Sequence, residues 1–219
     1  MILNTRPKPF SLTRDNTQHA ISDNEFSLPV FSIEPIDSHM RSVTCHIGIF
    51  VSLNAVECFF NHATIHANHL LAVGDATELA LKNKGYKNIH LPEEYSSEGL
   101  LKMPLLQDLS GKSVTIVCGE NTKTLLQETL TERGAHTIPV ICYRRVPIQH
   151  NMKKIFPALE KNSIDSVVSA SFESLEQLML LFKKPKHRAW LLDKKLLVLT
   201  EKMRTEAIKL GFQKVEVGI

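Results

Sequence analysis

The chain repeats itself, and this repeat limits the folds that it can adopt. Aligning Pro29 with Pro139 matches SLPVFSIEP with TIPVICYRR. A short apolar segment lies upstream of each, ILN at 2–4 and VTIV at 114–117, and each is typical of a buried strand. A polar stretch with helical character comes next in each copy; the second, TKTLLQETLTERGA, ends near Gly134, a typical residue just beyond a helix. Each copy is therefore predicted to be a β-α-β unit.

The segment after each copy repeats as well. IFVSLNAVECFF aligns with VSASFESLEQLM, and LAVGDATELALKNKGYKNI aligns with LVLTEKMRTEAIKLGFQKV. In the second pair Gly74 falls on Thr200 and Gly85 falls on Gly211, so the spacing is the same in both. The chain thus has the order A-B-A′-B′.

Strands that alternate with helical patterns predict an α/β protein with two doubly wound domains, each built on a parallel sheet. Two assemblies satisfy the repeat: A with B and A′ with B′, or the crossed form, A with B′ and A′ with B. In the crossed form the chain would pass between the domains just after PVFSIEP and PVICYRR, so these segments would be linkers. The repeat alone leaves both assemblies open.

Length and composition exclude several classes of protein. The 219 residues suffice for one large domain or two of ~100 residues. The net charge of +3 comes without a long basic run, which disfavours a nucleic-acid partner. No apolar stretch approaches the ~20 residues of a membrane span, and the N-terminus lacks a signal region, so we expect a cytoplasmic protein. The four cysteines form no CxxC pair and are expected to be reduced and buried.

Seven short motifs occur along the chain in this order: NTRP, FVSLNAVECFF, AVGDATELAL with KGY, SSEGLL, the block from GKSVTIVCGENTKT to TERGA, PVICYRR, and LLVLTEKMRTEAIKLGFQKVEV. This ordered series resembles the uroporphyrinogen-III synthases over nearly the whole chain. The resemblance implies the crossed assembly, in which two flavodoxin-like domains are joined by a two-stranded β-ladder, with a wide cleft between them.

The crossed assembly gives definite boundaries. The first domain would combine 1–35 with 151–219, and the second would span 40–142. The linker strands would cover about 30–40 and 142–150. Two thin linkers predict a hinge motion as the route by which substrate enters.

The resemblance also implies a reaction. The family takes the linear tetrapyrrole hydroxymethylbilane, removes its terminal hydroxyl as water and closes the macrocycle with inversion of ring D, through a spiro-pyrrolenine. The chain would then be a lyase of haem biosynthesis that needs no metal or organic cofactor. We expect a monomer that receives its substrate from hydroxymethylbilane synthase. The rival interpretation is a non-catalytic two-domain protein that binds an anionic tetrapyrrole.

The substrate carries acetate and propionate groups on every pyrrole, so its binding site must hold anions. In a doubly wound domain the helix N-termini meet at the carboxyl edge of the sheet, where free N–H groups and the helix dipole favour anions. The strand-to-helix junctions predicted to bind substrate are Ser52, Gly74, Ser171 and Thr200. Ser52 and Ser171 would serve equally well as plain helix caps.

Three further residues enter as substrate-binding candidates. Thr77 and Lys195 match a threonine and a lysine that the family places near substrate, and Arg6 follows the first strand within NTRP. Thr77 and Lys195 each have an ordinary alternative. Thr77 would otherwise be an exposed helix residue, and Lys195, in the run DKK, would be a solvated surface charge.

Tyr143 is the catalytic candidate. A hydroxyl leaves a carbon readily only when it is protonated or hydrogen-bonded, which is the task of a general acid. A tyrosine with a pKa of ~10 is a weak acid at neutral pH. We expect Arg144 or Arg145 to lower that pKa, unless strand alternation points them elsewhere. The matching position in the other copy holds Ile33, so only one of the twin segments offers a hydroxyl there.

Some residues depart from the family pattern and favour the rival interpretation. Where the family has a Gly-Pro-Thr-Thr-like junction, this chain has Thr200 to Met203, with the negative Glu201 beside the presumed carboxylates. Cys118 stands where an arginine is common. A separate motif, HATIHANH, spaces three histidines so that they would share a helix face, but no acid or cysteine completes a metal site and we predict none.

Overall fold

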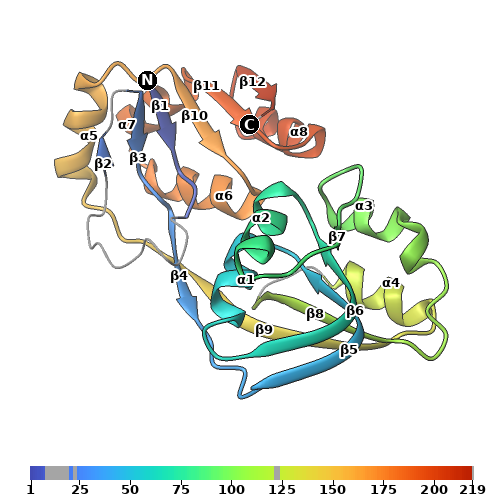
Figure 1. Cartoon of the computed structure of the whole chain (residues 1–219). Coiled ribbons are helices and arrows are strands. Elements are labelled where there is room, and N and C mark those ends of the chain that lie inside the picture. The colour runs from blue at the N-terminus through green and yellow to red at the C-terminus, as the bar shows by residue number, and fades with distance from the viewer. Residues whose placement is uncertain (8–19, 22–23, 121–123, 219) are drawn as a thin grey trace. The chain divides into compact units, whose positions relative to one another are not determined.

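The computed structural model describes residues 1–7, 20–21, 24–120 and 124–218 (Figure 1). The described residues form two compact units. The first takes those up to Ser32 together with those from Val146 onward, and the second holds Ile33–Arg145. The helix expected in the first copy of the repeat, between ILN and PVF, falls largely outside the described residues.

The first unit is built on a six-stranded sheet with the order β12-β11-β10-β1-β3-β2, in which only β2 runs antiparallel to its neighbour. Its strands are β1 (Ile2–Asn4), β2 (Ala20–Ile21), β3 (Glu25–Ser27), β10 (Ser166–Ser169), β11 (Lys195–Val198) and β12 (Lys214–Val217). Its helices are α5 (Met152–Lys161), α6 (Phe172–Leu181), α7 (Pro185–Leu192) and α8 (Glu201–Lys209).

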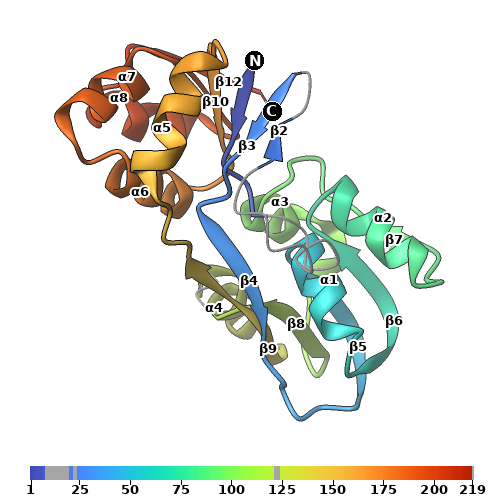
Figure 2. The ribbon, with the colours of Figure 1, turned by 90° about the vertical axis from the view of Figure 1, so that its left-hand side faces the viewer.

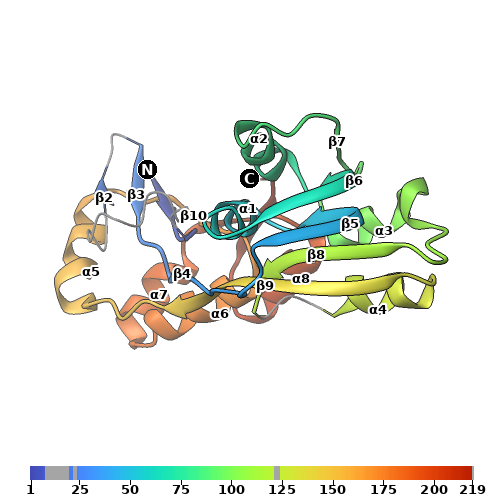
Figure 3. The ribbon, with the colours of Figure 1, turned by 60° about the horizontal axis from the view of Figure 1, so that its bottom comes forward.

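The second unit also has a six-stranded sheet, with the order β4-β9-β8-β5-β6-β7, whose central strands lie edge to edge in Figure 3. Its strands are β4 (Phe31–Pro35), β5 (Ser42–Phe50), β6 (Thr64–Ala72), β7 (Ile89–His90), β8 (Ser113–Gly119) and β9 (His136–Pro147). Its helical segments are α1 (Leu53–Phe59), α2 (Asp75–Asn83), α3 (Ser97–Lys102), the 3₁₀ turn η2 (Pro104–Leu106) and α4 (Leu125–Glu132).

These strand orders confirm the crossed assembly. In the first unit β1 and β3, from segment A, share a sheet with β10–β12 from B′, and β1 pairs with β10. In the second, β8 and β9 from A′ share a sheet with β5–β7 from B, and β8 pairs with β5. Counted from β10 or from β5, the parallel strands have the same order, 3-2-1-4-5, in both sheets. The order reverses between β10 and β1 and between β5 and β8. At such switch points the connections leave in opposite directions and open a crevice at the carboxyl edge.

Two strands form the predicted ladder. The N–H of Ile36 donates to the carbonyl of Cys142 at 2.8 Å, and the N–H of Ile148 donates to that of Val30 at 3.0 Å, so β4 and β9 run in opposite directions (Figure 2). The twin sequences do not fold identically. β9 is one continuous strand, whereas the first copy divides into β3 and β4 around Pro29.

Both faces of the second sheet are buried, which explains the continuous apolar run of its central strands. Phe50 and Val117 belong to one apolar cluster, while Ile47, Ile49 and Val114 belong to the other. The four cysteines are buried thiols that are not joined in disulfides, as predicted. No helix among the described residues is long and apolar enough to cross a membrane.

Glycines close corresponding helices in the two units. Gly85 follows α2 with φ 92° and Gly211 follows α8 with φ 104°, both in the left-handed region that glycine adopts without strain. Gly134 ends α4 with φ 87°, as predicted. Equivalent backbone geometry at Gly85 and Gly211 supports the repeat at the level of single residues.

The pair Gly85 and Gly211 generates a prediction. Gly85→Ala should lower the free energy of unfolding by about 1 kcal/mol, the cost of holding an alanine in the left-handed conformation. No steric clash adds to this cost, because a Cβ at Gly85 would have no atom within 4 Å. Gly211→Ala should cost more, because its Cβ would also lie 3.3 Å from Cδ1 of Leu192. Urea denaturation of the two variants measures both values. Equal losses would show that the contact with Leu192 relaxes freely.

Candidate active site

The crevice of the second unit lies where β5 and β8 end. Ser52 follows β5 and caps α1, because its Oγ accepts the N–H of Ala55 at 3.0 Å while its backbone is extended. The cap reading of Ser52 is therefore correct. The same hydroxyl also contacts Tyr143, whose oxygen lies 3.1 Å from Oγ of Ser52. Two predicted site residues, 91 positions apart, thus meet at a switch point.

A bulge in β9 directs Tyr143 to this place. Cys118 of β8 pairs with Ile141, but the next residue, Gly119, pairs with Tyr143, so Cys142 has no counterpart. Simple alternation would put Tyr143 on the face of Ile141, which is 39% exposed. Instead Cys142 and Tyr143 are both buried, and Tyr143 is only 4% exposed.

The tyrosine ring lies directly against the backbone of Gly119. A Cβ at this position would come within 2.7 Å of the ring atom Cζ, closer than any side chain allows. Gly119 is therefore required for the ring to reach Ser52. The sequence reasoning missed this role, although a glycine at a strand end is a known signal of close approach.

The environment of Tyr143 raises the pKa of its hydroxyl, mainly because burial disfavours the phenolate. The hydrogen bond with Ser52 and the charge of Arg145 act in the opposite direction but are weaker. Arg144 contributes little, since its guanidinium is paired with Glu34 at 2.9–3.0 Å. The expected net lowering of this pKa is therefore wrong. Tyr143 stays protonated at neutral pH, as a hydrogen-bond donor must.

The junction at Gly74 is covered by an aromatic ring that the sequence did not reveal. A Cβ on Gly74 would lie 3.0 Å from Cδ2 of Tyr95, and the Tyr95 hydroxyl donates to Oδ1 of Asp75 at 2.6 Å. This hydrogen bond raises the pKa of Tyr95. Asp75 supplies a carboxylate at the start of α2, so this helix terminus already has an anion. Thr77, in the same turn, is 3% exposed and is not the exposed helix residue of the alternative reading.

The first unit has the equivalent crevice between β1 and β10. Thr5 fixes it, because its buried hydroxyl donates to the carbonyl of Val168 at 2.6 Å. Arg6 follows, with its N–H bonded to Oδ1 of Asn4 at 3.0 Å. Its guanidinium Nε is buried and has no hydrogen-bond partner among the described residues. An unpaired buried donor is costly, so Arg6 is ready to bind an anion.

Ser171 and Thr200 both cap helices at this edge. Oγ of Ser171 accepts the N–H of Ser174 at 3.1 Å, and Oγ1 of Thr200 accepts the N–H of Met203 at 3.3 Å. Both therefore lie at the carboxyl ends of β10 and β11, as the repeat predicts.

Lys195 lies elsewhere. It is the first residue of β11 and pairs with Glu216 at 3.0 Å. The other three residues of the strand, about 10 Å, separate it from the carboxyl edge, beyond which Thr200 stands. The structure thus does not bring Lys195 together with Arg6, Ser171 and Thr200.

The departures from the family pattern have structural roles. Met203 is 8% exposed and belongs to the core of the first unit, and Cys118 is 4% exposed in the core of the second. Glu201 is exposed and pairs with Arg204 at 3.3 Å, which offsets its charge. Met203 and Cys118 are therefore core residues.

The histidine motif does not form a helix. His66 and His69 lie in β6, and Nδ1 of His69 is 3.4 Å from Nε2 of His90. Within the described ranges no three histidine, cysteine or acidic side chains gather as metal ligands would.

Comparison with known proteins agrees with these features. The family model "Uroporphyrinogen-III synthase HemD" matches residues 24–217. The chain is 34% identical over 148 residues to uroporphyrinogen-III synthase of Escherichia coli, a match that spans 67% of this chain and 60% of that protein. It is 29% identical over 233 aligned positions to the synthase of Salmonella typhimurium, covering 99% of this chain and 94% of that protein.

A solved structure has the same fold. The mutant uroporphyrinogen III synthase of Thermus thermophilus is 19% identical, with a TM-score of 0.58 over 98% of this chain and 91% of that one. The fold class predicted from the repeat is thereby confirmed. The family model covers most of the chain, including the switch point of the second unit and both ladder strands, and the chain belongs to the uroporphyrinogen-III synthase family.

Proposed function

We propose that the chain converts hydroxymethylbilane into uroporphyrinogen III, with loss of water and inversion of ring D. The observation that supports this most is the contact between Tyr143 and Ser52 at a switch point of the second unit, in a chain of this family. The reaction needs a hydrogen-bond donor for the leaving hydroxyl and contacts for several carboxylates. The two crevices supply groups of these two kinds.

A chain of hydrogen bonds prepares Tyr143 for its role. Ser52 Oγ accepts the N–H of Ala55, which leaves the Ser52 proton free to be donated to the tyrosine oxygen. Tyr143 can then direct its own proton towards the substrate hydroxyl. Hydrogen bonds in such a chain polarise one another, so α1 strengthens Tyr143 as a donor.

The raised pKa of Tyr143 defines what it does. It assists departure by hydrogen bonding, and the electrons come from the substrate. The carbon–oxygen bond breaks with its electron pair on oxygen, while the pyrrole nitrogen lone pair forms an azafulvene. The pyrrole nitrogen gives up its proton, which combines with the departing hydroxide to form water. The protein needs no redox step, and Tyr143 is returned unchanged.

We assign carboxylate binding to the first unit at Arg6, with Ser171 and Thr200 at the neighbouring helix ends. The unpartnered Nε of Arg6 supports this assignment most directly. In the second unit Gly74 and Thr77 stay in the proposal as neighbours of the substrate beneath Tyr95. Lys195 is left out, because it lies at the amino edge of its sheet.

We further propose that the protein works as a cytoplasmic monomer and takes its substrate from hydroxymethylbilane synthase. The linear tetrapyrrole closes by itself to the type I isomer, so a short transfer protects it. Membership of a biosynthetic family supports this setting.

The direct test is incubation with freshly made hydroxymethylbilane, followed by separation of the type III and type I isomers. Tyr143→Phe should lower kcat by about 10²-fold, because a hydrogen bond to the leaving group is lost. Affinity for the type III product should stay nearly unchanged. If the parent protein formed only the type I isomer, the proposed activity would be refuted and a non-catalytic binding protein would be favoured. Equal kcat in the variant would remove Tyr143 from the mechanism.

Arg6→Gln tests the carboxylate contact. Loss of a charge-assisted hydrogen bond should raise KM roughly tenfold while kcat changes less. Arg41→Gln is the matched control, because Arg41 is exposed and paired with Asp37. A KM that rises equally in both variants would mean that only the overall charge matters.

Gly119→Ala tests how Tyr143 is positioned. The added Cβ must push the ring away from Ser52, so the raised pKa should fall towards its ordinary value of ~10. Absorbance at alkaline pH, corrected by subtracting the Tyr143→Phe variant, follows this one hydroxyl. Gly85→Ala serves as control and should leave the titration unchanged. An unchanged titration in Gly119→Ala as well would show that the ring stays in place.

A further inference from the structure

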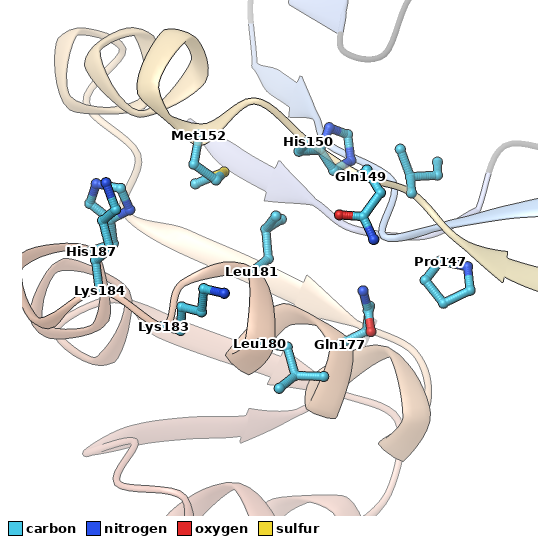
Figure 4. Close-up of a pocket in the computed structure, with 11 residues that line it drawn as sticks. Pro147, Gln149, His150, Met152, Gln177, Leu180, Leu181, Lys183, Lys184 and His187 are labelled. Carbon is cyan, nitrogen blue, oxygen red and sulfur yellow. The ribbon is translucent and has the colours of Figure 1, made fainter.

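Two helices of the first unit have no counterpart in the repeat. α7 stands between α6 and β11, whereas α1 is followed directly by β6, and α5 lies between β9 and β10, whereas β4 is followed directly by β5. Together with α6 and the segment that leads out of β9, these helices line an open pocket of about 480 Å³ (Figure 4). The residues that line the pocket all belong to the first unit.

The N-terminus of α7 lies at this pocket without a cap. Lys184 is the N-cap residue but makes no side-chain cap bond, and Pro185 at the first position has no N–H. The N–H groups of Lys186 and His187 therefore lack the partners that a capping side chain would provide. A helix N-terminus of this kind favours an anion.

The charges around the N-terminus of α7 also favour an anion. Lys183 and Lys184 both line the pocket, and no carboxylate of the described chain pairs with either. Lys186 is held by Glu160 at 2.9 Å. Cations at a helix N-terminus oppose the dipole and destabilise the helix. Lys184, at the N-cap of α7, is therefore unfavourable unless a negative ligand joins it, whereas Lys183 directly follows the C-cap of α6.

His187 supplies an independent observation. Its side chain lines the pocket, is 9% exposed and stacks on Phe156 with ring centroids 3.9 Å apart. Its Nδ1 is buried and has no hydrogen-bond partner among the described residues. A buried ring nitrogen left unpaired costs free energy, which a bound ligand would recover.

We propose that this pocket binds a small organic phosphate, with its phosphate at the N-terminus of α7 and its carbon skeleton against Met152, Leu180 and Leu181. Two unpaired lysines match the charge of about −1.5 to −2 of a phosphomonoester at neutral pH better than the single charge of a carboxylate. Gln149 and Gln177 extend into the same space and offer amide groups to the ligand (Figure 4).

This site goes beyond the proposed function. None of the lining residues belongs to the crevices described above. Gln177 lies six positions along α6 from Ser171, about 9 Å along the helix axis. The walls of the pocket include Pro147, the last residue of β9, and His150 in the segment that follows, so an occupant would contact the chain where it leaves the ladder.

The protein contains its own reporter for this pocket. Trp190 is its single tryptophan; it stacks on Phe182 at 5.8 Å and lies edge-on to Phe156 at 5.6 Å. Phe156 in turn stacks on His187. A ligand that bonds to His187 should therefore alter the fluorescence of Trp190.

The experiment titrates the full chain with phenyl phosphate and follows tryptophan fluorescence, with calorimetry as a second readout. We expect saturable binding that Lys184→Glu weakens at least tenfold. Lys161→Glu, the same charge change at the exposed end of α5, should leave the affinity unchanged. Circular dichroism checks that both variants are folded. Benzoate, which has a similar ring but a single charge, should bind at least tenfold more weakly than phenyl phosphate.

Three results would overturn the proposal. The first is no saturation in either readout up to ~10 mM phenyl phosphate. The second is an equal loss of affinity in Lys161→Glu, which would mean that only net charge matters. The third is equal affinity for benzoate, which would remove the preference for phosphate. None of these results depends on the formation of uroporphyrinogen III, so this proposal and the enzymatic one can fail separately.

Discussion

Each sheet is held at its centre by strands from different copies of the repeat, and the functional geometry depends on this pairing. Leu3 of β1 is in register with Val167 of β10, and Ile49 of β5 with Ile116 of β8. Because these central pairs unite distant segments, the strand order reverses between them. The reversal opens the crevice at the carboxyl edge of each sheet, where Arg6 and Ser52 stand.

Within the second unit, the catalytic proposal depends on how closely two segments approach. The bulge at Cys142 turns Tyr143 out of simple alternation, and the missing side chain of Gly119 admits the ring. Burial then keeps the hydroxyl protonated, while Ser52 orients it. These features together make Tyr143 a donor. They also explain why Ile33, at the matching position of the other copy, has no such role: it is an apolar core residue without a hydroxyl.

The two units have diverged in their additions to the common plan. The second gained α3 and η2, and its Gly74 junction is covered by Tyr95. The first gained α5 and α7, which create the phosphate pocket proposed for Lys183, Lys184 and His187. A shared fold thus supports different sites in its two halves, because each site is built from residues or helices that the other half lacks.

The sequence by itself determined the architecture and the chemical groups. Repeated spacing, from Gly74 to Gly85 and from Thr200 to Gly211, predicted matching helices, because strand and helix periodicities are local properties. Resemblance selected the crossed assembly and pointed to Tyr143. Only the tertiary structure decided which candidates meet. It brought Ser52 to Tyr143, set Lys195 at the opposite edge, and reversed the expected shift of the tyrosine pKa, because register, bulges and burial arise from contacts between distant segments that no local pattern records.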